Sequence, residues 1–317
     1  MSPRRPKGPR ALVALGALAA SAAVWGIGIE RHLYTVRHAT LAVLPPGATP
    51  LRVLHLSDVH MAPWQSRKQA WIAHLASLRP DLIVNTGDNL GHPDALRGIR
   101  AAFAGFRGIP GVYVHGSNDL FAPQPRNPMR YFLGPSRRRI EVDELDTDTM
   151  DRFFTETLGW SGLNNASARL DVAGVRIDAF GVDDAHHDLD RLDLVPQLAS
   201  GLTAPGREPS APAALTIGVT HAPYRRVLDA FTDAGADAIF AGHTHGGQVR
   251  VPGLGALVAN CDLPLDQVRG LSTWQRGGRR VPLHVSAGLG HSIYAPVRFA
   301  CPPETTLLTL LPRTDVV

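Results

Sequence analysis

Cysteine is scarce in this chain of 317 residues, which contains only Cys261 and Cys301. Neither lies in a C-x-x-C pair or at another spacing typical of metal-binding thiolates, which excludes a cysteine-rich zinc site. In a protein that folds outside the cytoplasm, two cysteines permit a single disulfide. The spacing equally fits two unrelated buried thiols, so both alternatives stay open.

An excess of positive charge is also lacking beyond the first 37 residues. The chain has 32 Lys and Arg against 28 Asp and Glu, a net charge of +4 and an isoelectric point near 9.4. Residues 1–37 contain six of the basic residues and one acidic residue, so the remainder is close to neutral. A basic surface is the main electrostatic mark of nucleic-acid binding. The composition therefore argues against a nuclease, and we expect no nucleic-acid partner.

An uncharged, mostly apolar run occupies residues 11–29 and follows a basic tail at residues 1–10. A membrane-spanning helix needs about 20 such residues. The positive-inside bias predicts a single-pass anchor in the cell membrane, with the tail in the cytoplasm and the folded domain outside. Ala20-Ser21-Ala22 resembles a signal-peptide cleavage site, and cleavage there would give a secreted protein. Because the apolar run continues through Trp25 to Ile29, we favour the uncleaved anchor.

Residues 30–50 are predicted to form a linker, and residues 51–312 a single folded domain. Within that domain, apolar runs at 51–56, 81–85 and 111–115 alternate with helical patterns at 66–78 and 95–106. This order is typical of an α/β fold with a largely parallel sheet. The remaining predicted elements are helices at 148–158 and 224–232, a hairpin at 166–182, and strands at 215–220, 236–240, 281–286 and 305–311.

Five of the predicted strands end in residues that can bind a metal. These residues are Asp58 with His60, Asp88, Asn118, His221, and His243 with His245. Asp58, Asp88 and Asn118 are 30 residues apart, the length of successive strand–helix units. Ligands of open α/β sheets bind beyond the carboxyl ends of the strands. We therefore expect these side chains to meet at one edge of the domain.

The mixture of carboxylate, imidazole and amide groups suits two divalent metal ions. Asp88 is placed to bridge two ions, because a carboxylate has two oxygens. Two ions about 3.5–4 Å apart can clamp the attacking and leaving oxygens of a phosphoryl transfer, and they lower the pKa of bound water towards 7. Mixed nitrogen and oxygen donors suit Mn, Fe or Zn better than Ca. We therefore predict two divalent metal cofactors.

The motifs Asp-x-His, Gly-Asp, an Asn-containing turn, a lone His and Gly-His-x-His, in this order over residues 51–311, resemble the calcineurin-like metallophosphoesterases. The resemblance implies two mixed β-sheets packed face to face with helices on the outside. It also implies that Asp58, His60, Asp88 and His245 hold one metal, and that Asp88, Asn118, His221 and His243 hold the other. The segments GHTHGGQVRVPGLGA and VRFACPPETTLLTL are similar to a subgroup of membrane-anchored bacterial phosphoesterases.

One motif departs from the family pattern, which has Gly-Asn-His-Asp/Glu, with Asn as a ligand and His protonating the leaving group. This chain has Gly116-Ser117-Asn118-Asp119 instead. Alignment on Gly116 places Ser117 at the ligand position and Asn118 at the His position. Alignment on the strand start places Asn118 at the ligand position and Asp119 at the His position. We prefer the second, because strand length sets where a ligand emerges, and we expect Asn118 and Asp119 at the catalytic centre. Asp119 would act only when protonated, which nearby anions favour.

Other residues carry weaker signals. For Asp183, Asp184, His186 and His187 we favour a solvated loop over a place in the site. His291 is a candidate substrate contact, and His55 and His115 are expected to have packing roles. Residues 120–147 are either a phosphate-binding lid or a solvated loop, the second being preferred; their arginines are Arg126, Arg130, Arg137, Arg138 and Arg139.

These features together predict a phosphoester hydrolase that uses a hydroxide on a dinuclear metal centre. Asp119 in place of the family's histidine favours substrates with good leaving groups, such as phosphodiesters or pyrophosphates. An anchor brings the site near lipid headgroups, so a lipid-linked phosphate is a candidate substrate. The alternatives are a phosphomonoesterase or protein phosphatase, and a non-catalytic metal-binding scaffold on the same fold.

Overall fold

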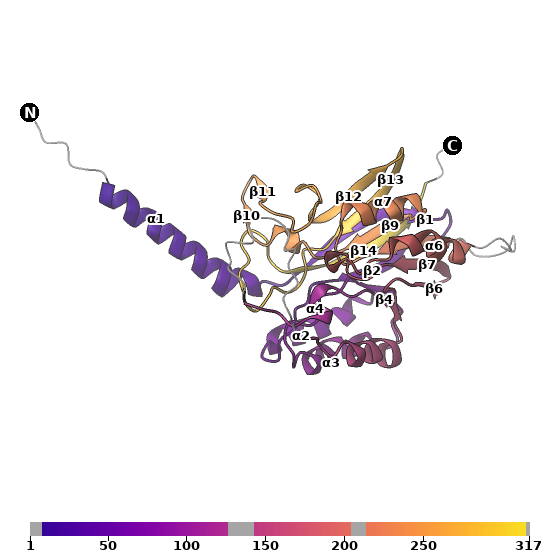
Figure 1. Cartoon of the computed structure of the whole chain (residues 1–317), viewed down its shortest axis with the longest axis horizontal. Helices are drawn as coiled ribbons and strands as arrows, with labels where there is room; N and C mark the ends of the chain where they lie inside the picture. Colours follow the sequence, from indigo (N-terminus) through magenta and orange to yellow (C-terminus); the bar gives the residue numbers. More distant parts are fainter. Residues whose placement is uncertain (1–7, 126–142, 204–213, 315–317) are drawn as a thin grey trace, which may run out of the picture.

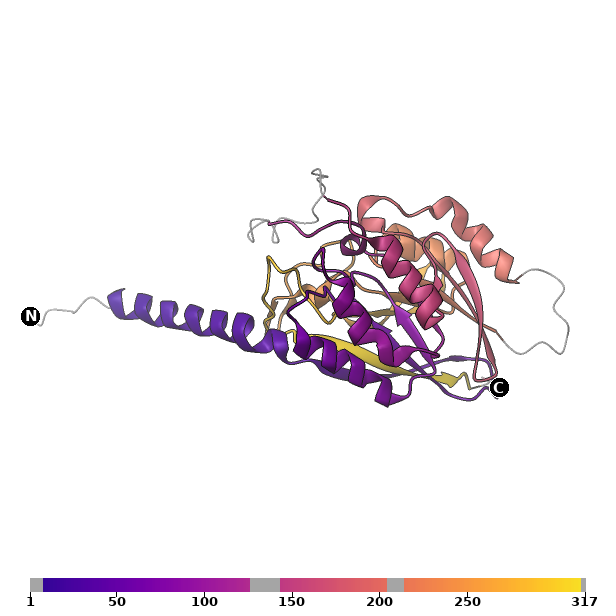
Figure 2. The same cartoon turned by 90° about the horizontal axis from the view of Figure 1, so that it is seen from below.

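Two six-stranded mixed sheets pack face to face, and helices cover their outer faces (Figures 1 and 2). The computed structural model describes residues 8–125, 143–203 and 214–314. The predicted four-layer α/β architecture is confirmed. Each sheet has four adjacent parallel strands. Antiparallel pairs are added outside them, so both sheets are mixed. The sheets are therefore less uniformly parallel than the early strand–helix alternation predicts.

The first sheet has the order β1-β14-β2-β3-β4-β5. Its strands are β1 (Thr35–Leu44), β14 (Glu304–Pro312), β2 (Leu51–Leu56), β3 (Leu82–Asn85), β4 (Gly111–Tyr113) and β5 (Ser161–Gly162). Strands β2 to β5 are parallel, whereas β14 runs antiparallel to β2 and parallel to β1. The carboxyl ends of β2, β3 and β4 therefore lie at one edge.

The second sheet has the order β12-β13-β9-β8-β7-β6. Its strands are β12 (Gly270–Arg276), β13 (Arg279–Val285), β9 (Ala238–Ala241), β8 (Ala214–Val219), β7 (Val175–Gly181) and β6 (Ser167–Val172). Strands β13, β9, β8 and β7 are parallel, and β12 and β6 pair antiparallel at the two edges. A short hairpin of β10 (Arg250–Val251) and β11 (Gly255–Ala256) lies outside both sheets.

Side-chain alternation along the strands explains the layers. In β2, Leu51 and Val53 face the second sheet, whereas Leu54 and Leu56 face the helices on the other side. Helices α2 (Ser66–His74) and α3 (Leu96–Phe103) bury that outer face, and in Figure 1 they lie below the sheets. The other helices are α4 (Ser117–Leu120), α5 (Thr147–Arg152), α6 (Val195–Thr203), α7 (Arg225–Asp233), and the short η3 (Leu75–Leu78), η4 (Ala104–Phe106), η6 (Phe153–Leu158), η7 (Ala185–His187), η8 (Leu192–Leu194) and η9 (His245–Gly247). Helices α6 and α7 cover the second sheet.

The N-terminal helix projects from the domain in both views (Figures 1 and 2). It consists of α1 (Gly8–Ala23), a π-helical turn η1 (Val24–Ile29) and a 3-10 turn η2 (Glu30–His32). The segment Leu12–His32 has a mean hydropathy of 2.0 and is long enough to cross a membrane. The same length and composition also fit a signal sequence. Its last turns differ from the rest, since Gly26 and Glu30 are buried against the folded domain.

Residues 30–50 are not a simple linker, which corrects the prediction for this segment. Strand β1 occupies Thr35–Leu44 and pairs in parallel with β14 along its whole length. Its polar alternation hid it in the sequence, because an edge strand exposes one face. The two cysteines are both free, so the disulfide alternative is excluded for this structure. The arginine-rich part of the 120–147 insertion lies outside the described residues.

Candidate metal centre

The predicted metal-binding residues follow strands of both sheets and meet at one end of the sandwich. They are, in chain order, Asp58 and His60 after β2, Asp88 after β3, Asn118 after β4, His221 after β8, and His243 with His245 after β9. The backbone N–H of His243 donates to both carboxylate oxygens of Asp58 at 3.1 Å. This contact joins the two sheets where their strands end, as the strand-end rule predicts.

Four of these residues form a compact cluster, in which ligand atoms lie within 4.8 Å of one another: Asp58, His60, Asp88 and His245. Nε2 of His60 lies 3.1 Å from Nε2 of His245 and 3.3 Å from Oδ2 of Asp88. Nε2 of His245 lies 3.4 Å from Oδ1 of Asp58. Two imidazoles and two carboxylates that converge in this way match the donor set of a divalent transition metal.

Asp88 also contacts a second group of predicted ligands. Nε2 of His221 lies 3.5 Å from Oδ2 of Asp88. Asn118 donates its backbone N–H to Oδ1 of Asp88 at 2.7 Å and its Nδ2 to Oδ2 at 2.9 Å. The ring of His243 is centred 5.1 Å from the ring of His221. Asp88 is therefore shared by both groups, which is the position that a bridging carboxylate needs.

The hydrogen bonds of the histidines leave ring nitrogens for a metal. Nδ1 of His221 lies 2.7 Å from the carbonyl oxygen of Thr86 and so carries the proton. Its buried Nε2 has no hydrogen-bond partner among the described residues. Burial lowers the pKa of His60 and of His245 well below the ordinary value, so both rings are neutral at pH 7. Neutral imidazoles fit metal ligation, and the oriented N–H of His221 leaves its Nε2 for a metal. Nδ1 of His60 has no hydrogen-bond partner among the described residues.

The carboxylates give the site excess negative charge. Burial raises the pKa of Asp88 and of Asp58 above the ordinary value. Burial by itself lowers the pKa of His221, but the charges of Asp88, Asp58 and Asp184 outweigh it and raise that pKa overall. A cation bound here would relieve the repulsion among these groups. The residues present therefore fit a divalent metal.

The backbone at these ligands is left-handed, with positive φ at Asp58 (48°), His60 (41°), Asp88 (54°), His243 (68°) and His245 (50°). Each such conformation costs an L residue about 1–3 kcal/mol and persists only where the surroundings impose it. Here, the amide of Asp58 donates to the carbonyl of Gly87 at 2.8 Å, and that of His60 to the carbonyl of Asp88 at 2.9 Å. Local strain is thus concentrated at the candidate site.

Glycines allow the backbone to approach the carboxylates closely. A Cβ on Gly242 would lie 2.0 Å from Oγ of Ser57 and 2.7 Å from Oδ2 of Asp58. A Cβ on Gly116 would lie 2.3 Å from Oδ1 of Asp88. Any larger residue at either position would displace a candidate ligand.

Comparison with known proteins agrees with this geometry. The family model described as "Calcineurin-like phosphoesterase" matches residues 51–247. The chain belongs to the calcineurin-like phosphoesterase family. It is therefore a metallophosphoesterase, a hydrolase that cleaves phosphoester bonds, and the cluster around Asp88 is its candidate metal-binding group.

Two relatives from Bacillus subtilis (strain 168) match most of this phosphoesterase. The uncharacterized metallophosphoesterase YkuE is 24% identical over 310 residues, which cover 93% of this chain and 94% of YkuE. The uncharacterized metallophosphoesterase YkoQ is 26% identical over 274 residues, which cover 82% of this chain and 84% of YkoQ. Both matches cover more of the chain than the family model does.

Among solved structures, the Haemophilus influenzae NAD nucleotidase NadN matches 76% of this chain. The match has 12% sequence identity and a TM-score of 0.44. This phosphoesterase spans about half of that chain, with a coverage of 51%.

Asp119 is buried in this phosphoesterase, and we propose for it a structural role in place of the catalytic one that the sequence predicts. Its buried carboxylate accepts hydrogen bonds from the backbone N–H groups of Asn89, Leu90 and Gly116 and from Nδ2 of Asn89, at 2.7–3.3 Å. Four donors occupy its two oxygens, and burial raises its pKa. Asp119 therefore ties the turn before α4 to the loop after β3, while Asn118 faces Asp88.

Asp184 and His186 belong to the site, contrary to the solvated loop that we favoured. Asp184 is buried and accepts hydrogen bonds from Oγ of Ser117 and Nδ1 of His187, both at 2.7 Å. The ring of His186 is centred 4.7 Å from that of His243. The signal in the sequence was the same strand-end rule, because Asp184 follows β7 as Asp88 follows β3.

The remaining histidines have other surroundings. His55 is buried between the sheets, and His115 forms an ion pair with Asp151 at 2.9 Å. His291 is buried, and its Nδ1 lies 3.0 Å from the carbonyl oxygen of Ser292, so its contact with substrate stays a prediction. Arg126, Arg130, Arg137, Arg138 and Arg139 lie outside the described residues.

Proposed function

We propose that this phosphoesterase hydrolyses a phosphodiester or pyrophosphate bond with two divalent metals, Mn, Fe or Zn. One metal is held by Asp58, His60, Asp88 and His245, and the other by Asp88, Asn118, His221 and His243. The observation that carries the proposal is the shared position of Asp88, whose Oδ2 lies 3.3 Å from Nε2 of His60 and 3.5 Å from Nε2 of His221. A carboxylate between two imidazoles of different ligand groups suits a bridge.

Bound metals would supply an activated water and positive charge for the phosphoryl oxygens. The residues of the chain orient this chemistry. The carboxylate of Asp58 accepts a hydrogen bond from the backbone N–H of His243. Asn118 donates hydrogen bonds to both carboxylate oxygens of Asp88. The carboxamide oxygen and nitrogen of Asn118 exchange places on a half-turn of the terminal torsion. In that orientation, its oxygen takes the ligand position that we assign to it.

The substrate preference follows from the loop after β4. Asn118 is the side chain that this loop offers to the site, and a carboxamide cannot protonate a leaving alkoxide. Asp119 is engaged by four N–H donors and cannot replace the acid. Substrates with a stabilised leaving group, such as diesters with acidic alcohols or pyrophosphates, depend least on protonation. Simple alkyl monoesters depend on it most.

A lipid-linked phosphate is the substrate class that we favour. The support is the apolar segment Leu12–His32. Only 6% of its most apolar stretch is buried inside the structure. We propose that this segment anchors the enzyme in the cell membrane, with the domain outside the cytoplasm. The metal centre then works beside lipid headgroups.

The test uses the full-length protein in detergent, loaded in turn with Mn, Zn and Fe. Turnover of a bis-aryl phosphodiester and an aryl pyrophosphate is compared with that of an alkyl phosphomonoester. D88N should lose both metal occupancy and turnover, whereas D171N, an exposed Asp→Asn control on β6, should keep both. Undiminished turnover in D88N would contradict the mechanism. Faster turnover of the monoester would support the phosphomonoesterase alternative, and an inactive protein with full metal would support the scaffold alternative.

A further inference from the structure

The end of the N-terminal helix reaches the candidate metal centre through one buried arginine. We propose that Arg298 is a positioning residue for the metal ligand His245, and that Glu30 and Gly26 of the helix hold Arg298 in place. The inference rests on the metal assignment of His245 made above. The segment 24–30 is then part of the metal centre's framework as well as the end of an anchor.

Arg298 is 0% exposed, although arginine is almost never fully buried without partners. Its Nη1 donates to the carbonyl oxygen of His245 at 3.0 Å, and its Nη2 donates to the carbonyl oxygen of Gly290. The same carbonyl of Gly290 lies 3.3 Å from Nδ1 of His245. The guanidinium therefore fixes the backbone of His245 and the acceptor of its ring at the same time.

This arrangement places an acceptor for an N–H at Nδ1 of His245. Nδ1 of His245 lies 3.3 Å from the carbonyl oxygen of Gly290, which can only accept, and 3.1 Å from Nη2 of Arg298, which can only donate. Metal binding at Nε2 requires the tautomer with the proton on Nδ1, and the carbonyl of Gly290 is then its acceptor. Nε2 is the atom that lies 3.1 Å from His60 and 3.4 Å from Asp58. A partner that orients the far nitrogen of a ligating histidine commonly controls metal affinity. Arg298 orients that partner, and its Nη2 also lies 3.1 Å from Nδ1 of the ring.

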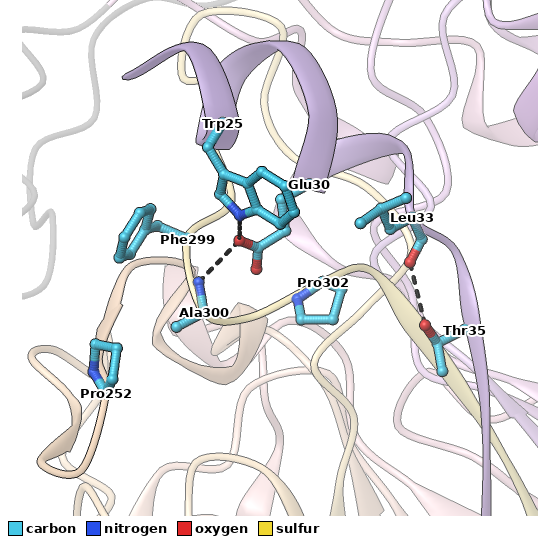
Figure 3. A pocket seen from close by; sticks show the side chains of 8 residues that line it. All are labelled: Trp25, Glu30, Leu33, Thr35, Pro252, Phe299, Ala300 and Pro302. Carbon is cyan, nitrogen blue, oxygen red and sulfur yellow. Dashed lines mark hydrogen bonds between the residues drawn. The ribbon is translucent and has the colours of Figure 1, made fainter. Parts of the chain in front are cut away.

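Glu30 holds the segment that carries Arg298 (Figure 3). Its side chain is buried, 4% exposed, at the foot of the helix. Oε1 accepts the backbone N–H of Cys301 at 2.6 Å, and Oε2 accepts the backbone N–H of Ala300 at 3.0 Å. Oε2 also accepts a hydrogen bond from the Nε1–H of Trp25 at 2.6 Å. Glu30 is therefore bonded both to its own helix and to residues 300–301. Hydrogen bonds to a carboxylate are stronger than neutral ones.

Gly26 contacts Arg298 from the same helix. The backbone N–H of Arg298 donates to the carbonyl of Gly26 at 3.1 Å, and a Cβ on Gly26 would lie 2.9 Å from the carbonyl oxygen of Arg298. On the opposite side, Sγ of Cys301 lies 3.4 Å from the carbonyl oxygen of His245. Residues 298–301 are therefore held between the helix and the His245 turn.

The experiment uses full-length protein in detergent and measures the affinity of each site by Mn²⁺ titration. We expect R298M to weaken the site containing His245 by about 10–100-fold, the usual effect of losing an outer-shell partner. R298K keeps one donor group, so the affinity of this site should fall less than in R298M. E30Q should weaken the same site, because its NH₂ group would face the backbone donors of Cys301 or Ala300. The matched controls are the exposed R107M and E156Q.

A merely structural role would give a different pattern. R298M would then lower the melting temperature while both sites kept their wild-type affinities, or weakened by the same factor. Either result overturns the proposal.

A second readout separates the proposal from the proposed function. If wild-type protein binds no metal, the metal assignment fails, but hydrogen exchange still tests the contacts. Exchange at residues 245–247 should be faster in R298M and E30Q than in both controls. Exchange equal to that of the controls would contradict the positioning role, with or without metal.

Discussion

Nδ1 of His55 lies 2.7 Å from Nδ1 of His284 in the buried space between the two sheets. The contact begins a chain of hydrogen bonds towards the metal centre. Nε2 of His55 lies 3.0 Å from Oγ1 of Thr86, which donates to Oγ of Ser57 at 2.7 Å, and Ser57 donates to Oδ2 of Asp58. Because Thr86 gives its proton to Ser57, it must accept from His55. His284 is then the donor to Nδ1 of His55, and every donor points towards Asp58.

Replacement of His55 by leucine should break this chain. His284 and Thr86 would each lose a partner in a buried place, which costs about 1–3 kcal/mol for each unsatisfied group. Burial lowers the pKa of both histidines, so the chain is neutral and its loss changes orientation rather than charge. We expect a lower melting temperature and about 10-fold weaker metal binding. H74L, at an exposed position on α2, is the control, and equal metal affinity in the two variants would contradict the role of the chain.

Replacement of Gly242 by alanine should disrupt the first metal group. The new Cβ would meet Ser57 at 2.0 Å and Asp58 at 2.7 Å. Overpacking of this kind costs about 1–3 kcal/mol of unfolding free energy. Displacement of Asp58 should also reduce metal occupancy, measured by elemental analysis of the purified protein. G16A, where the structure has open space on α1, should keep full metal occupancy. Full occupancy in G242A would show that the turn relaxes without moving the ligand.

Replacement of Asp119 by asparagine tests its structural role. An Asn side chain presents an NH₂ group where the carboxylate accepts N–H donors, so we expect a loss of about 1–3 kcal/mol in the free energy of unfolding. The pH dependence of kcat/KM should keep its wild-type shape, because Asp119 donates no proton to the leaving group. The exposed D171N variant serves as control for the charge change. If D119N alone lost one limb of the pH profile of kcat/KM, Asp119 would be the acid that protonates the leaving group.

The ion pair of His115 with Asp151 predicts a pH-dependent stability. Burial lowers the pKa of His115, but the hydrogen bond and charge of Asp151, with Asp119 and Asp183, outweigh it and raise the pKa overall. A histidine whose pKa is higher in the folded state stabilises the protein fully below pH 6.5, its value when unfolded. That contribution is lost as the pH rises through the folded-state pKa.

The measurement compares the unfolding free energies of wild type and H115Q from pH 6 upward. A hydrogen bond to a charged group is worth about 1.5–3 kcal/mol, so H115Q should be less stable by about this amount at pH 6. The difference should shrink at alkaline pH. A difference that stays constant with pH would mean that His115 has the same charge in both states.

The strand-end residues were predictable because their signals are local. A short apolar run predicts a buried strand, and the residue after it must lie at an edge of the sheet. Asp58, Asp88 and His221 each follow such a run. Parallel pairing of β2 with β3 brings Asp58 to Asp88, and the face-to-face packing of the sheets brings His221, after β8, to them. The order of motifs therefore determined the family, the face-to-face sheets and the set of candidate ligands before any coordinates.

Tertiary structure alone decided where the remaining groups point. Asp119 is engaged by hydrogen-bond donors from Asn89 and Leu90, about thirty residues earlier in the chain. Edge strand β1 and the contact of Glu30 with Cys301 depend on pairing between the two ends of the chain. Local patterns carry no information on such partners. The sequence by itself determined which residues can bind metal, and long-range packing decided which of them are held, by whom, and in which orientation.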